Sequence, residues 1–535
     1  MWQGYRREHN MTASSRLYSV ARVQELDRRT LETGVPGFSL MMEAGRAAFD
    51  EIRRRWPERR RWCVFCGAGH NAGDGYVVAG LAARLGLAVQ LVALREPQTL
   101  DGAAAEAVAF ARHSGVDFTL WRDETAIADD TELVVDALLG IGLAGEVRSP
   151  FDRAIAMINR AGRPVVALDL PSGLDGDTGA LCGETVRADL TVTFIAKKFG
   201  LYTGAAPDVT GEIVLAPLSL DRALLASTPP QGELMAPSRP ARTLPPRTPT
   251  THKGHCGHLL VVGGQPGFGG ATLMSAETAA RLGAGLVSLA TDAVHIAPAL
   301  ARCPELMVSA VRSGLEIEAL LQKATAVLIG PGLGQSAWGQ GLMQAVMNAP
   351  GPRIVDADAL HLLAREEAVE RREDRILTPH PGEAAMLLGV TTDEVQKDRL
   401  TAARALWRRY GGVIVLKGAG TLVLGAGSGA RAATEWPSLH NAPPGEADLR
   451  CLVSRFGNPG MASGGMGDVL GGIIASLLVQ GLSCFEAAAT GVLVHALAAD
   501  DAACDGGERG LLASDLAGYA RRRVNWQSLE RTGAG

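Results

Sequence analysis

Short apolar runs alternate with longer segments of helical pattern through most of this chain, and that order limits the possible folds more than any other feature. In the first half we expect strands at Trp62–Cys66, Ala88–Leu94, Glu132–Ala137 and Pro164–Leu170, with helices at Tyr76–Leu85, Gly102–His113 and Phe151–Ala161. In the second half we expect strands at Gly285–Leu289, Ala326–Ile329, Arg353–Asp356 and Val413–Leu416. The alternation predicts an α/β fold in which helices cover both faces of parallel sheets.

A proline-rich stretch interrupts this order near the middle of the chain. The chain has 535 residues, enough for two or more domains that each bury a core. Seven prolines fall between Pro229 and Pro249, which is typical of an exposed, semi-extended linker. We therefore expect domains at residues 15–220 and 251–530 and a linker at 221–250. Cleavage near Arg242 should then release two halves that fold independently.

The composition excludes several classes of protein. A formal net charge of −5 offers no basic field for nucleic acid. No uninterrupted apolar run reaches the ~18 residues of a membrane span, and the first ten residues lack the apolar core of a signal peptide. Eight scattered cysteines indicate reduced thiols, and Cys63 and Cys66 should be buried on opposite faces of one strand. We expect a cytoplasmic protein with no nucleic-acid or membrane partner.

Glycine and acidic residues follow three successive strands of the first domain. The segments are Gly67–Gly75, Asp136–Gly145 and Asp169–Asp175. Because the carboxyl ends of parallel strands meet at one edge of a sheet, these turns should line a single crevice. Their oxygen-bearing side chains Asn71, Asp136 and Ser172 could hold a hard monovalent cation. Each Asp could equally be a turn-capping residue, and the spacing does not separate the two interpretations.

The second half repeats this arrangement around a second cleft. The segments at its expected strand ends are Gly330–Gly334, Asp356–Leu360, Thr378–Glu383 and Lys417–Thr421. His380 lies between two prolines and should be held rigidly. Upstream, His252, His255, His258 and Cys256 are close together in sequence but lack distant partner ligands, so we do not expect a metal site there.

The most glycine-rich stretch, Asn458–Asp468, leads directly into an apolar segment of helical length. Four glycines within ten residues allow a close approach of the backbone to a ligand, and the free N–H groups of a helix start attract anions. Asp468 would face that anion site and could accept a proton from an attacking hydroxyl. The alternative is an ordinary helix cap, which does not require so many glycines.

Together these motifs resemble the bifunctional NAD(P)H-hydrate repair enzymes, in which an epimerase domain is fused to an ADP- or ATP-dependent dehydratase domain. The resemblance extends over residues 17 to 525. Its specific motifs are Gly67–Gly75, Asp136–Gly142, Asp169–Gly173, His252–Gly254, Gly330–Gly334, Thr378–Glu383 and Asn458–Asp468. It implies a Rossmann-like three-layer domain at residues 15–220 and a ribokinase-like α/β domain at residues 251–530.

The resemblance also implies roles for individual residues. The implied substrate contacts of the first domain are His70, Asn71, Ala72, Gly73, Asp74, Gly140, Ile141, Gly142, Leu143, Ala144, Gly145, Glu146 and Asp169. The implied potassium ligands are Asn71, Asp136 and Ser172. The implied substrate contacts of the second domain are Ala271, Gly334, His380 and Asp468, and the implied nucleotide site is Lys417, Gly418, Ala419, Gly420, Thr421 and Gly467. Asp169 and Asp468 are the expected catalytic residues.

The implied reaction restores NADH or NADPH that has added water at carbon six of the nicotinamide ring. Hydroxide is a poor leaving group, so a kinase-like site would first phosphorylate the hydroxyl, and loss of phosphate would then restore the ring. The implied partners are hydrated NADH or NADPH and an adenine nucleotide, with ADP favoured over ATP as donor. Mg²⁺ and K⁺ are the implied ions, and we expect a homo-oligomer.

The chain departs from the family pattern at several positions. His70 replaces a usual Asn, Met42 stands where Glu is common, and Ser463 and Met466 stand where Thr is usual. About fifteen extra residues lie near Leu439 to Val453.

Two other functions are weighed against repair. The cleft of the second domain also suits a small-molecule kinase for a sugar or hydroxymethylpyrimidine, because fold alone does not select the substrate. A catalytically idle nucleotide-binding scaffold is the other alternative, and the presence of both Asp136 and Asp468 argues against it.

Overall fold

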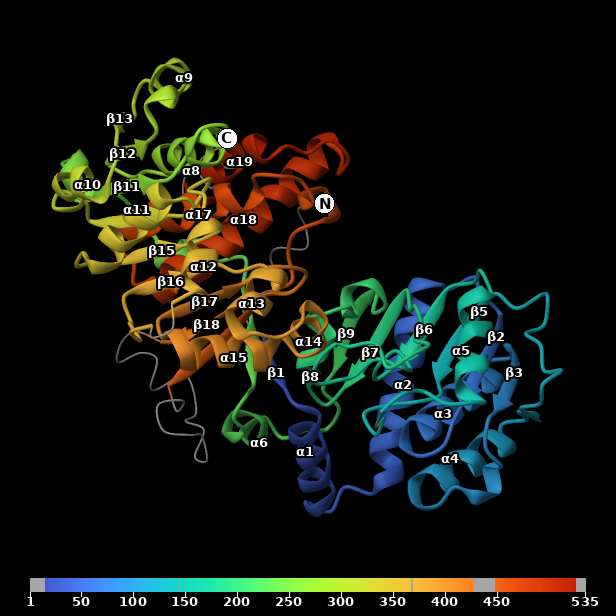
Figure 1. Cartoon of the computed structure of the whole chain (residues 1–535). Helices are drawn as coiled ribbons and strands as arrows, with labels where there is room; N and C mark the ends of the chain where they lie inside the picture. Colours follow the sequence, from blue (N-terminus) through green and yellow to red (C-terminus); the bar gives the residue numbers. More distant parts are fainter. Residues whose placement is uncertain (1–14, 144, 367–368, 428–447, 526–535) are drawn as a thin grey trace. The chain divides into compact units, whose positions relative to one another are not determined.

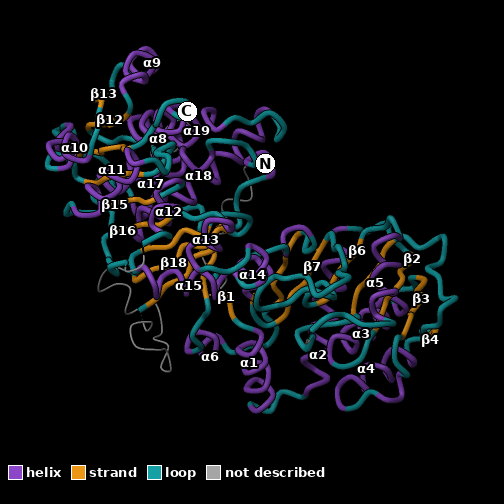
Figure 2. The backbone as a smooth tube through the Cα atoms, viewed as in Figure 1, coloured by secondary structure: helices purple, strands orange, loops and turns teal. Residues whose placement is uncertain are grey.

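The computed structural model describes residues 15–143, 145–366, 369–427 and 448–525 (Figure 1). Its helices and strands group into two compact units, residues 1–233 and 234–535, which we call the first and second unit. Figure 2 shows the helices and strands alternating along the backbone in each unit. The α/β class expected from the sequence is confirmed.

A parallel sheet forms the centre of the first unit. Its strands, in spatial order, are β4 (Phe118–Leu120), β3 (Ala88–Ala93), β2 (Arg61–Cys66), β5 (Leu133–Ala137), β6 (Val165–Leu168), β7 (Leu190–Phe194) and β9 (Glu212–Ala216). Three short strands lie outside it: β1 (Arg16–Tyr18) pairs with β8 (Lys197–Lys198) and with β10 (Gly232–Leu234). All neighbours in the main sheet pair in parallel, so the carboxyl ends of β2, β5 and β6 lie at one edge.

Helices cover both faces of that sheet. They are α1 (Val20–Glu32), α2 (Gly37–Arg55), α3 (His70–Arg84), α4 (Gly102–His113), α5 (Phe151–Arg160) and α6 (Arg222–Ser227). One core contains buried residues of α1 to α4 and the other contains those of α5. Cys66 lies in the first core and Cys63 in the second, which confirms that the two thiols are buried on opposite faces.

The helix α3 begins six residues earlier than the sequence indicates. We expected a glycine-rich turn up to Gly75, yet the helix starts at His70, after Gly69 with φ 89°. Glycine usually weakens a helix, but here it permits close packing. A Cβ at Gly73 would lie 2.4 Å from the sulfur of Met41, and one at Gly75 would lie 2.5 Å from Cβ of Ala137.

The second unit is built on a larger, mixed sheet. Its strands, in spatial order, are β13 (Met307–Ala310), β12 (Leu286–Thr291), β11 (His258–Val262), β14 (Ala326–Ile329), β15 (Arg353–Val355), β16 (Arg375–Leu377), β17 (Val413–Leu416), β18 (Thr421–Ala426) and β19 (Leu449–Ser454). The strands from β13 to β17 pair in parallel, and β18 and β19 are antiparallel additions.

Its helices again lie on both faces of the sheet (Figure 1). They are α7 (Arg239–Thr243), α8 (Gly269–Arg281), α9 (Ile296–Arg302), α10 (Gly314–Leu321), α11 (Ala337–Asn348), α12 (Asp358–Leu363), α13 (Pro381–Leu388), α14 (Thr392–Lys397), α15 (Arg399–Tyr410), α17 (Met466–Val479), α18 (Cys484–Gly506) and α19 (Leu516–Val524). The largest core joins α8, α17 and α18 to the sheet. Close packing of α17 on α8 depends on Gly472, where a Cβ would lie 2.4 Å from the carbonyl oxygen of Ser275.

The helix α18 is longer than any apolar segment we expected. Among the described residues it alone has the length and composition to cross a membrane, and 78% of its apolar window is buried inside the protein. It packs against α17, α19 and α7.

The segment expected to be an exposed linker is largely structured. It contains α6, β10 and α7, and Leu225 and Met235 are buried in the cores of the first and second unit. Arg239 of α7 donates to Glu486 Oε2 at 2.6 Å and to Thr490 Oγ1 at 3.3 Å. The compact units divide between Glu233 and Leu234, so a cut near Arg242 would fall inside the packed α7.

We therefore expect the two possible starts of an isolated second unit to differ in stability. A chain from Leu234 should keep α7 and Met235, whereas a chain from Pro245 loses both. Burying a methionine side chain contributes roughly 1.5–3 kcal/mol, so the shorter chain should have a Tm lower by at least a few degrees. Thermal unfolding of the two chains checks this, and equal Tm values would show that residues 234–244 do not stabilise the unit.

Candidate active sites

The three glycine-rich segments of the first unit line one cavity of about 600 Å³, as the sequence predicts. It lies at the carboxyl ends of β2, β5 and β6. Sequence-predicted residues in its wall are His70, Asn71, Asp74, Gly140, Ile141, Gly142, Leu143 and Asp169. Ala72 is buried in the core and Gly73 packs against Met41, so neither lines the cavity. Gly145 and Glu146 are not among its lining residues, and Ala144 lies outside the described residues.

A buried ion pair fixes Asp169 in this cavity. Lys198 Nζ contacts Asp169 Oδ1, and it also donates to Thr193 Oγ1 at 3.1 Å and to the Phe194 carbonyl at 3.0 Å. Asp169 Oδ1 further accepts from Phe194 N at 3.1 Å and from Thr193 Oγ1 at 3.3 Å. Lys198 is only 1% exposed, although it lines the cavity. Sequence reasoning missed Lys198; its position just after β7, in a chain with six lysines, was the available signal.

Two more carboxyl groups line the same cavity. Burial, reinforced by the charges of Asp169 and Asp27, holds the pKa of Asp74 well above its ordinary value. Burial also raises the pKa of Asp27, against the opposing effect of His70. A cavity lined by several carboxyl groups, two of them with raised pKa, is suited to proton transfer. Asp27, on α1, is a second residue that sequence reasoning missed.

Backbone strain is concentrated at the two candidate sites. Among the described residues, four that are not glycine have positive φ: Asp169 (65°), Ile195 (66°), Leu218 (53°) and Ala357 (46°). The first three line the cavity of the first unit, and Ala357 separates Asp356 from Asp358 in the second unit. Such conformations persist where the surrounding structure holds them, and they are common at functional sites.

Asp136 and Ser172 are bonded to each other, and Asn71, in the cavity wall, lies beside the turn that follows Asp136. Asp136 Oδ1 accepts from Ser172 Oγ at 2.6 Å, and Asp136 Oδ2 accepts from Ser172 N at 2.8 Å. Burial raises the pKa of Asp136 to about 6, although these bonds oppose the rise. Asn71 lies against Gly140, where a Cβ would be 3.1 Å from its own, and neither polar atom of its buried carboxamide has a hydrogen-bond partner among the described residues. A cation bonded to the Asn71 oxygen would give that atom a partner, while the amide nitrogen would still need an acceptor.

In the second unit, the glycine-rich turn ends at the start of α17. Gly465 has φ 89° and precedes the helix, so only glycine fits there without strain. Space around Gly464 is open, with no atom within 4 Å of an added Cβ. Asn458 and Gly457 bind the carboxylate of Asp500 on α18 at 3.0 and 3.1 Å, which fixes the turn to the core. The open space at Gly464, next to the start of α17, is where an anion could approach the N–H groups of the helix start.

Charged residues from other strand ends gather beside that turn. Lys417 Nζ, after β17, lies 2.9 Å from Asp356 Oδ1, after β15, and 3.7 Å from Glu383 Oε2. Burial lowers the pKa of Lys417, but the carboxylates of Asp356 and Glu383 outweigh it and the net shift is upward. A Cβ on Gly467 would lie 3.4 Å from Lys417 Nζ, so the lysine reaches the first turn of α17.

Asp468 lies in the first turn of α17, and the pKa of its carboxyl group is close to neutral pH. Burial raises its pKa to about 7, helped by Asp356 and opposed by Lys417. A carboxyl group of this kind can both accept and return a proton at physiological pH. Ser275 Oγ bridges the backbone carbonyls of Asp468 and Ala271, at 2.9 and 3.1 Å, and so joins two predicted substrate positions.

The remaining predicted residues are fixed by neighbours of the same cluster. Asp358 Oδ2 accepts from Gly334 N at 2.8 Å. His380 caps α13, and its Nδ1 accepts from Gly382 N and Glu383 N at 3.0 and 3.2 Å. With Nδ1 accepting, the proton of a neutral imidazole is on Nε2, and the side chain is 55% exposed. His380 is therefore a rigid cap with an exposed ring, and its Nε2 lies 3.5 Å from Glu383 Oε1.

A buried arginine supports the predicted nucleotide loop. Arg399 donates from Nη2 to the carbonyls of Leu416 and Lys417 at 3.1 and 3.0 Å, and burial lowers its pKa to about 10. Thr421 Oγ1 donates to the carbonyl of Gly418 at 2.7 Å, which closes the loop of residues 417–421. Arg399 lies far from the loop in sequence, and no motif indicated it.

The residues that depart from the family pattern occupy structural positions. Met42 packs against the core of the first unit and Met466 is buried in that of the second. Ser463 Oγ donates to the carbonyl of Leu511 at 3.1 Å. Of the extra segment, residues 439–447 lie outside the described residues, and Leu449–Val453 belong to β19, which pairs with β18.

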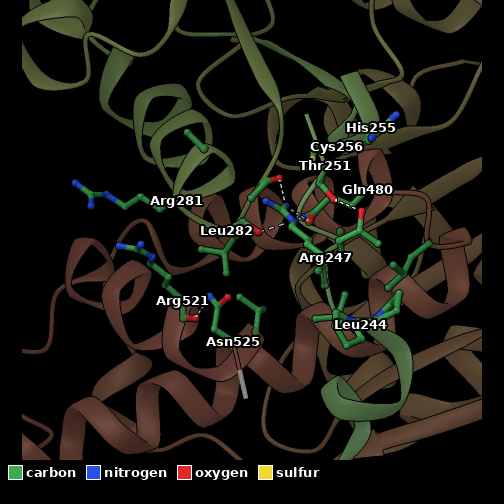
Figure 3. A pocket seen from close by; sticks show the side chains of 18 residues that line it. Leu244, Arg247, Thr251, His255, Cys256, Arg281, Leu282, Gln480, Arg521 and Asn525 are labelled. Atoms are coloured by element: carbon green, nitrogen blue, oxygen red, sulfur yellow. Dashed lines mark hydrogen bonds between the residues drawn. The ribbon is translucent and has the colours of Figure 1, made fainter. Parts of the chain in front are cut away.

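A larger cavity of about 890 Å³ in the second unit contains none of the predicted site residues (Figure 3). Arg247 extends into it and donates to Gln480 Oε1 at 2.6 Å and to the Gly283 carbonyl at 2.7 Å. Its wall includes Leu477 and Gln480, at the end of α17 opposite to Asp468. It is therefore separate from the Asp468 cluster.

The fold and the two clusters define a fused enzyme of two α/β units, one with a carboxyl-rich cavity and one with a kinase-like anion turn. A family model described as YjeF-related protein N-terminus matches residues 37–200, and a model described as NAD(P)H-hydrate dehydratase matches residues 259–435 and 446–522. The dehydratase match resumes at residue 446, so the strand β19 belongs to the shared fold.

Relatives of known name match nearly the whole chain. A bifunctional NAD(P)H-hydrate repair enzyme of Coxiella burnetii is 44% identical over 509 residues, which cover 95% of this chain and 99% of that protein. The enzyme of that name from Escherichia coli is 44% identical over 494 residues, covering 92% and 90%. A solved structure of the ADP/ATP-dependent NAD(P)H-hydrate dehydratase from Bacillus subtilis, co-crystallised with ATP/Mg²⁺, is 27% identical, covers 55% of this chain and 98% of its own, and has a TM-score of 0.45. The chain belongs to the family of bifunctional NAD(P)H-hydrate repair enzymes.

Proposed function

We propose that the first unit interconverts the R and S hydrates of NADH and NADPH, and that the second unit converts the S hydrate back to the dinucleotide at the expense of ADP. The observation that carries this proposal is the placement of Asp468 at the glycine-rich start of α17, beside Lys417 and Asp356. That arrangement supplies a base, an anion site and a cation at one strand edge, which phosphoryl transfer to a hydroxyl requires.

In the second unit, Asp468 accepts the proton of the ring hydroxyl as its oxygen attacks the terminal phosphorus of the nucleotide. The N–H groups of residues 464–467 and the ammonium of Lys417 stabilise the charge that develops on the transferred group. The loop of residues 417–421, supported by Arg399, holds the magnesium complex of ADP as co-substrate. The lone pair of the ring nitrogen then expels phosphate, which leaves carbon six with the carbon–oxygen bonding electrons. Loss of a proton from carbon five to the departing phosphate forms the carbon five–carbon six double bond and restores the dihydronicotinamide. Ala271, Gly334 and His380 hold the hydrated nucleotide.

In the first unit, the carboxyl-rich cavity holds the hydrated ring, and Asp169 exchanges protons with it. The residues Asn71, Asp136 and Ser172 suit K⁺, because they offer oxygen ligands and because the buried Asn71 carboxamide otherwise lacks partners. When bound, K⁺ supplies positive charge against the phosphates of the substrate. Asp136 orients Ser172 through two hydrogen bonds and so holds the turn that carries Asp169.

The competing small-molecule kinase predicts a different product, and this separates the two functions experimentally. We expect the full chain to regenerate the near-ultraviolet absorbance of NADH from its S hydrate only when a nucleotide is added, and faster with ADP than with ATP. Inorganic phosphate should appear in equal amount. A stable phosphorylated product without recovery of absorbance would support the kinase, and no nucleotide turnover would support an idle scaffold.

The cytoplasmic location and the homo-oligomeric state stay predictions. Size-exclusion chromatography with light scattering tests the oligomeric state directly.

A further inference from the structure

This inference rests on the proposed epimerase function of the first unit and concerns how that unit moves protons. The carbon whose configuration changes bears both a hydroxyl group and the ring nitrogen. Inverting it through ring opening requires one group to remove the hydroxyl proton and another to protonate the nitrogen as the carbon–nitrogen bond breaks. A site for this reaction needs an ionised and a protonated group facing one cavity.

Lys198 holds one carboxylate oxygen of Asp169 and leaves the other free. The three donors of its ammonium are occupied by Asp169 Oδ1, Thr193 Oγ1 and the Phe194 carbonyl, so it has none left for substrate. Every hydrogen bond that the described residues make to the Asp169 side chain falls on Oδ1. Oδ2 is therefore the oxygen available to accept a proton.

Asp74 has the opposite surroundings. It is 8% exposed, lines the same cavity and forms no ion pair with any described residue. The helices packed on this turn of α3 present apolar groups, Met41 from α2 and Ala104 from α4. Burial and the nearby carboxylates hold the pKa of Asp74 well above its ordinary value, so its surroundings favour the protonated form more than those of an exposed carboxyl group do.

The charged and titratable groups around Asp74 come from several elements. They are Asp27 and Arg28 of α1, His70 of α3, Cys66 of β2, Asp169 after β6, and Lys198 of β8. The ammonium of Lys198 is bonded to Asp169, so its effect on Asp74 is largely offset by that carboxylate. The net effect of the surroundings is to keep Asp74 neutral.

We propose that Asp74 is the general acid and Asp169 the general base of epimerisation, and that Lys198 is the positioning residue that decides which carboxyl has which role. Asp169 takes the hydroxyl proton, the oxygen's electron pair forms an aldehyde, the bond from carbon six to the ring nitrogen breaks, and the nitrogen takes the proton of Asp74. Rotation about the carbon chain exposes the other aldehyde face, and the reverse steps close the ring. Both protons are returned, and no oxidant or reductant is needed.

The ring-opening route avoids expelling hydroxide. Hydroxide is a poor leaving group, and the route needs only the two proton transfers that the cavity carboxyl groups can supply. The opened intermediate carries no net charge beyond that of the substrate.

The first test compares three isosteric variants of the full chain. Asp74→Asn and Asp169→Asn should each slow interconversion of the R and S hydrates by ~10²–10⁴-fold, because each removes one proton-transfer group. Asp27→Asn is the matched control, a third cavity carboxyl, and should slow it by less than about tenfold. Dehydration of the S hydrate by the same protein samples reports that the chain is folded. If Asp74→Asn keeps near wild-type interconversion, or if Asp27→Asn is the more damaged variant, the assignment is wrong.

The second test uses the pH dependence. Interconversion by the wild type should fall at high pH as Asp74 ionises, and this alkaline decline should be absent in Asp74→Asn. In Lys198→Met the rate should fall while the alkaline decline remains, because Asp169 loses the ammonium group that holds its Oδ1 in place. If Lys198→Met instead abolishes the alkaline decline, Lys198 is itself the acid and the proposal fails.

Loss of the fold and loss of interconversion are measured separately. Lys198→Met leaves a buried carboxylate without its partner, so its unfolding is measured beside the wild type, and Asp74→Asn tests the proposal without that risk. A wild-type protein that does not interconvert the hydrates at all would overturn the epimerase function. A wild type that does so while Asp74→Asn retains both its rate and its alkaline decline would overturn only this inference.

Discussion

Asp468→Asn is expected to lose most of the turnover of the dehydration reaction, by ~10²–10⁴-fold, while binding ADP with little change in affinity. The amide keeps the shape and capping ability of the side chain but cannot accept the hydroxyl proton. Because the pKa of Asp468 is raised to about 7, wild-type turnover should also decline as the pH falls through 7, where the base becomes protonated. That decline should be missing from the residual activity of Asp468→Asn.

The matched control removes a carboxylate from the first turn of a different helix. Asp393, in the first turn of α14, is exposed and makes none of the contacts described for the cluster, and Asp393→Asn should retain full turnover. Steady-state kinetics with the S hydrate, together with calorimetric titration of ADP, measure both effects. Near wild-type turnover in Asp468→Asn would remove Asp468 as the base. Loss of ADP binding would instead make it a nucleotide or metal contact.

Asp136→Ala is expected to abolish interconversion of the R and S hydrates and to leave dehydration of the S hydrate intact. The substitution removes the carboxylate that binds Ser172 N and Oγ and Leu138 N, so two strand-end turns lose their shared anchor. It also removes one of the three oxygen ligands proposed for K⁺. Each unsatisfied buried group costs about 1–3 kcal/mol, so Tm should fall as well.

Asp136→Asn is the control for shape. The amide keeps one acceptor oxygen but loses the negative charge. If Asp136→Asn has a higher Tm than Asp136→Ala but still does not interconvert the hydrates, the loss of interconversion is due to the missing charge. Loss of both activities in a folded Asp136→Ala protein would contradict the assignment of separate sites in the two units.

The sequence predicts the strands and the strand-end chemistry well because both depend on local pattern. The strands β14 and β17 have the expected bounds, and the helix α4 does too. Buried parallel strands appear as continuous apolar runs, and ligands of such folds collect at their carboxyl ends, so the glycine and Asp positions indicated the cavity. The different surroundings of Asp74 and Asp169 could not be predicted, because Asp169 is bonded to Lys198, a partner from another strand.

The errors arise where tertiary packing overrides local preference. The glycines at the start of α3 predict a turn, yet they lie in a helix. Glycine is needed at Gly73 and Gly75 because Met41 and Ala137 leave no room for a side chain. The prolines predict an exposed linker, yet Met235 is buried in the core of the second unit and Arg239 donates a hydrogen bond to Glu486. Arg399 carries no motif, because a buried cation that binds two carbonyls is recognisable only when the fold brings them together.

The most direct test of the central claim is the extent of repair from a mixture of R and S hydrates of NADH. The near-ultraviolet absorbance is followed to completion with excess ADP for the wild type, for Asp136→Ala and for Asp468→Asn. If the two units carry the two proposed activities, the wild type recovers all the absorbance, Asp136→Ala recovers only the S fraction, and Asp468→Asn recovers almost none in the same time. Complete recovery by Asp136→Ala, beyond spontaneous interconversion measured without protein, would contradict the account.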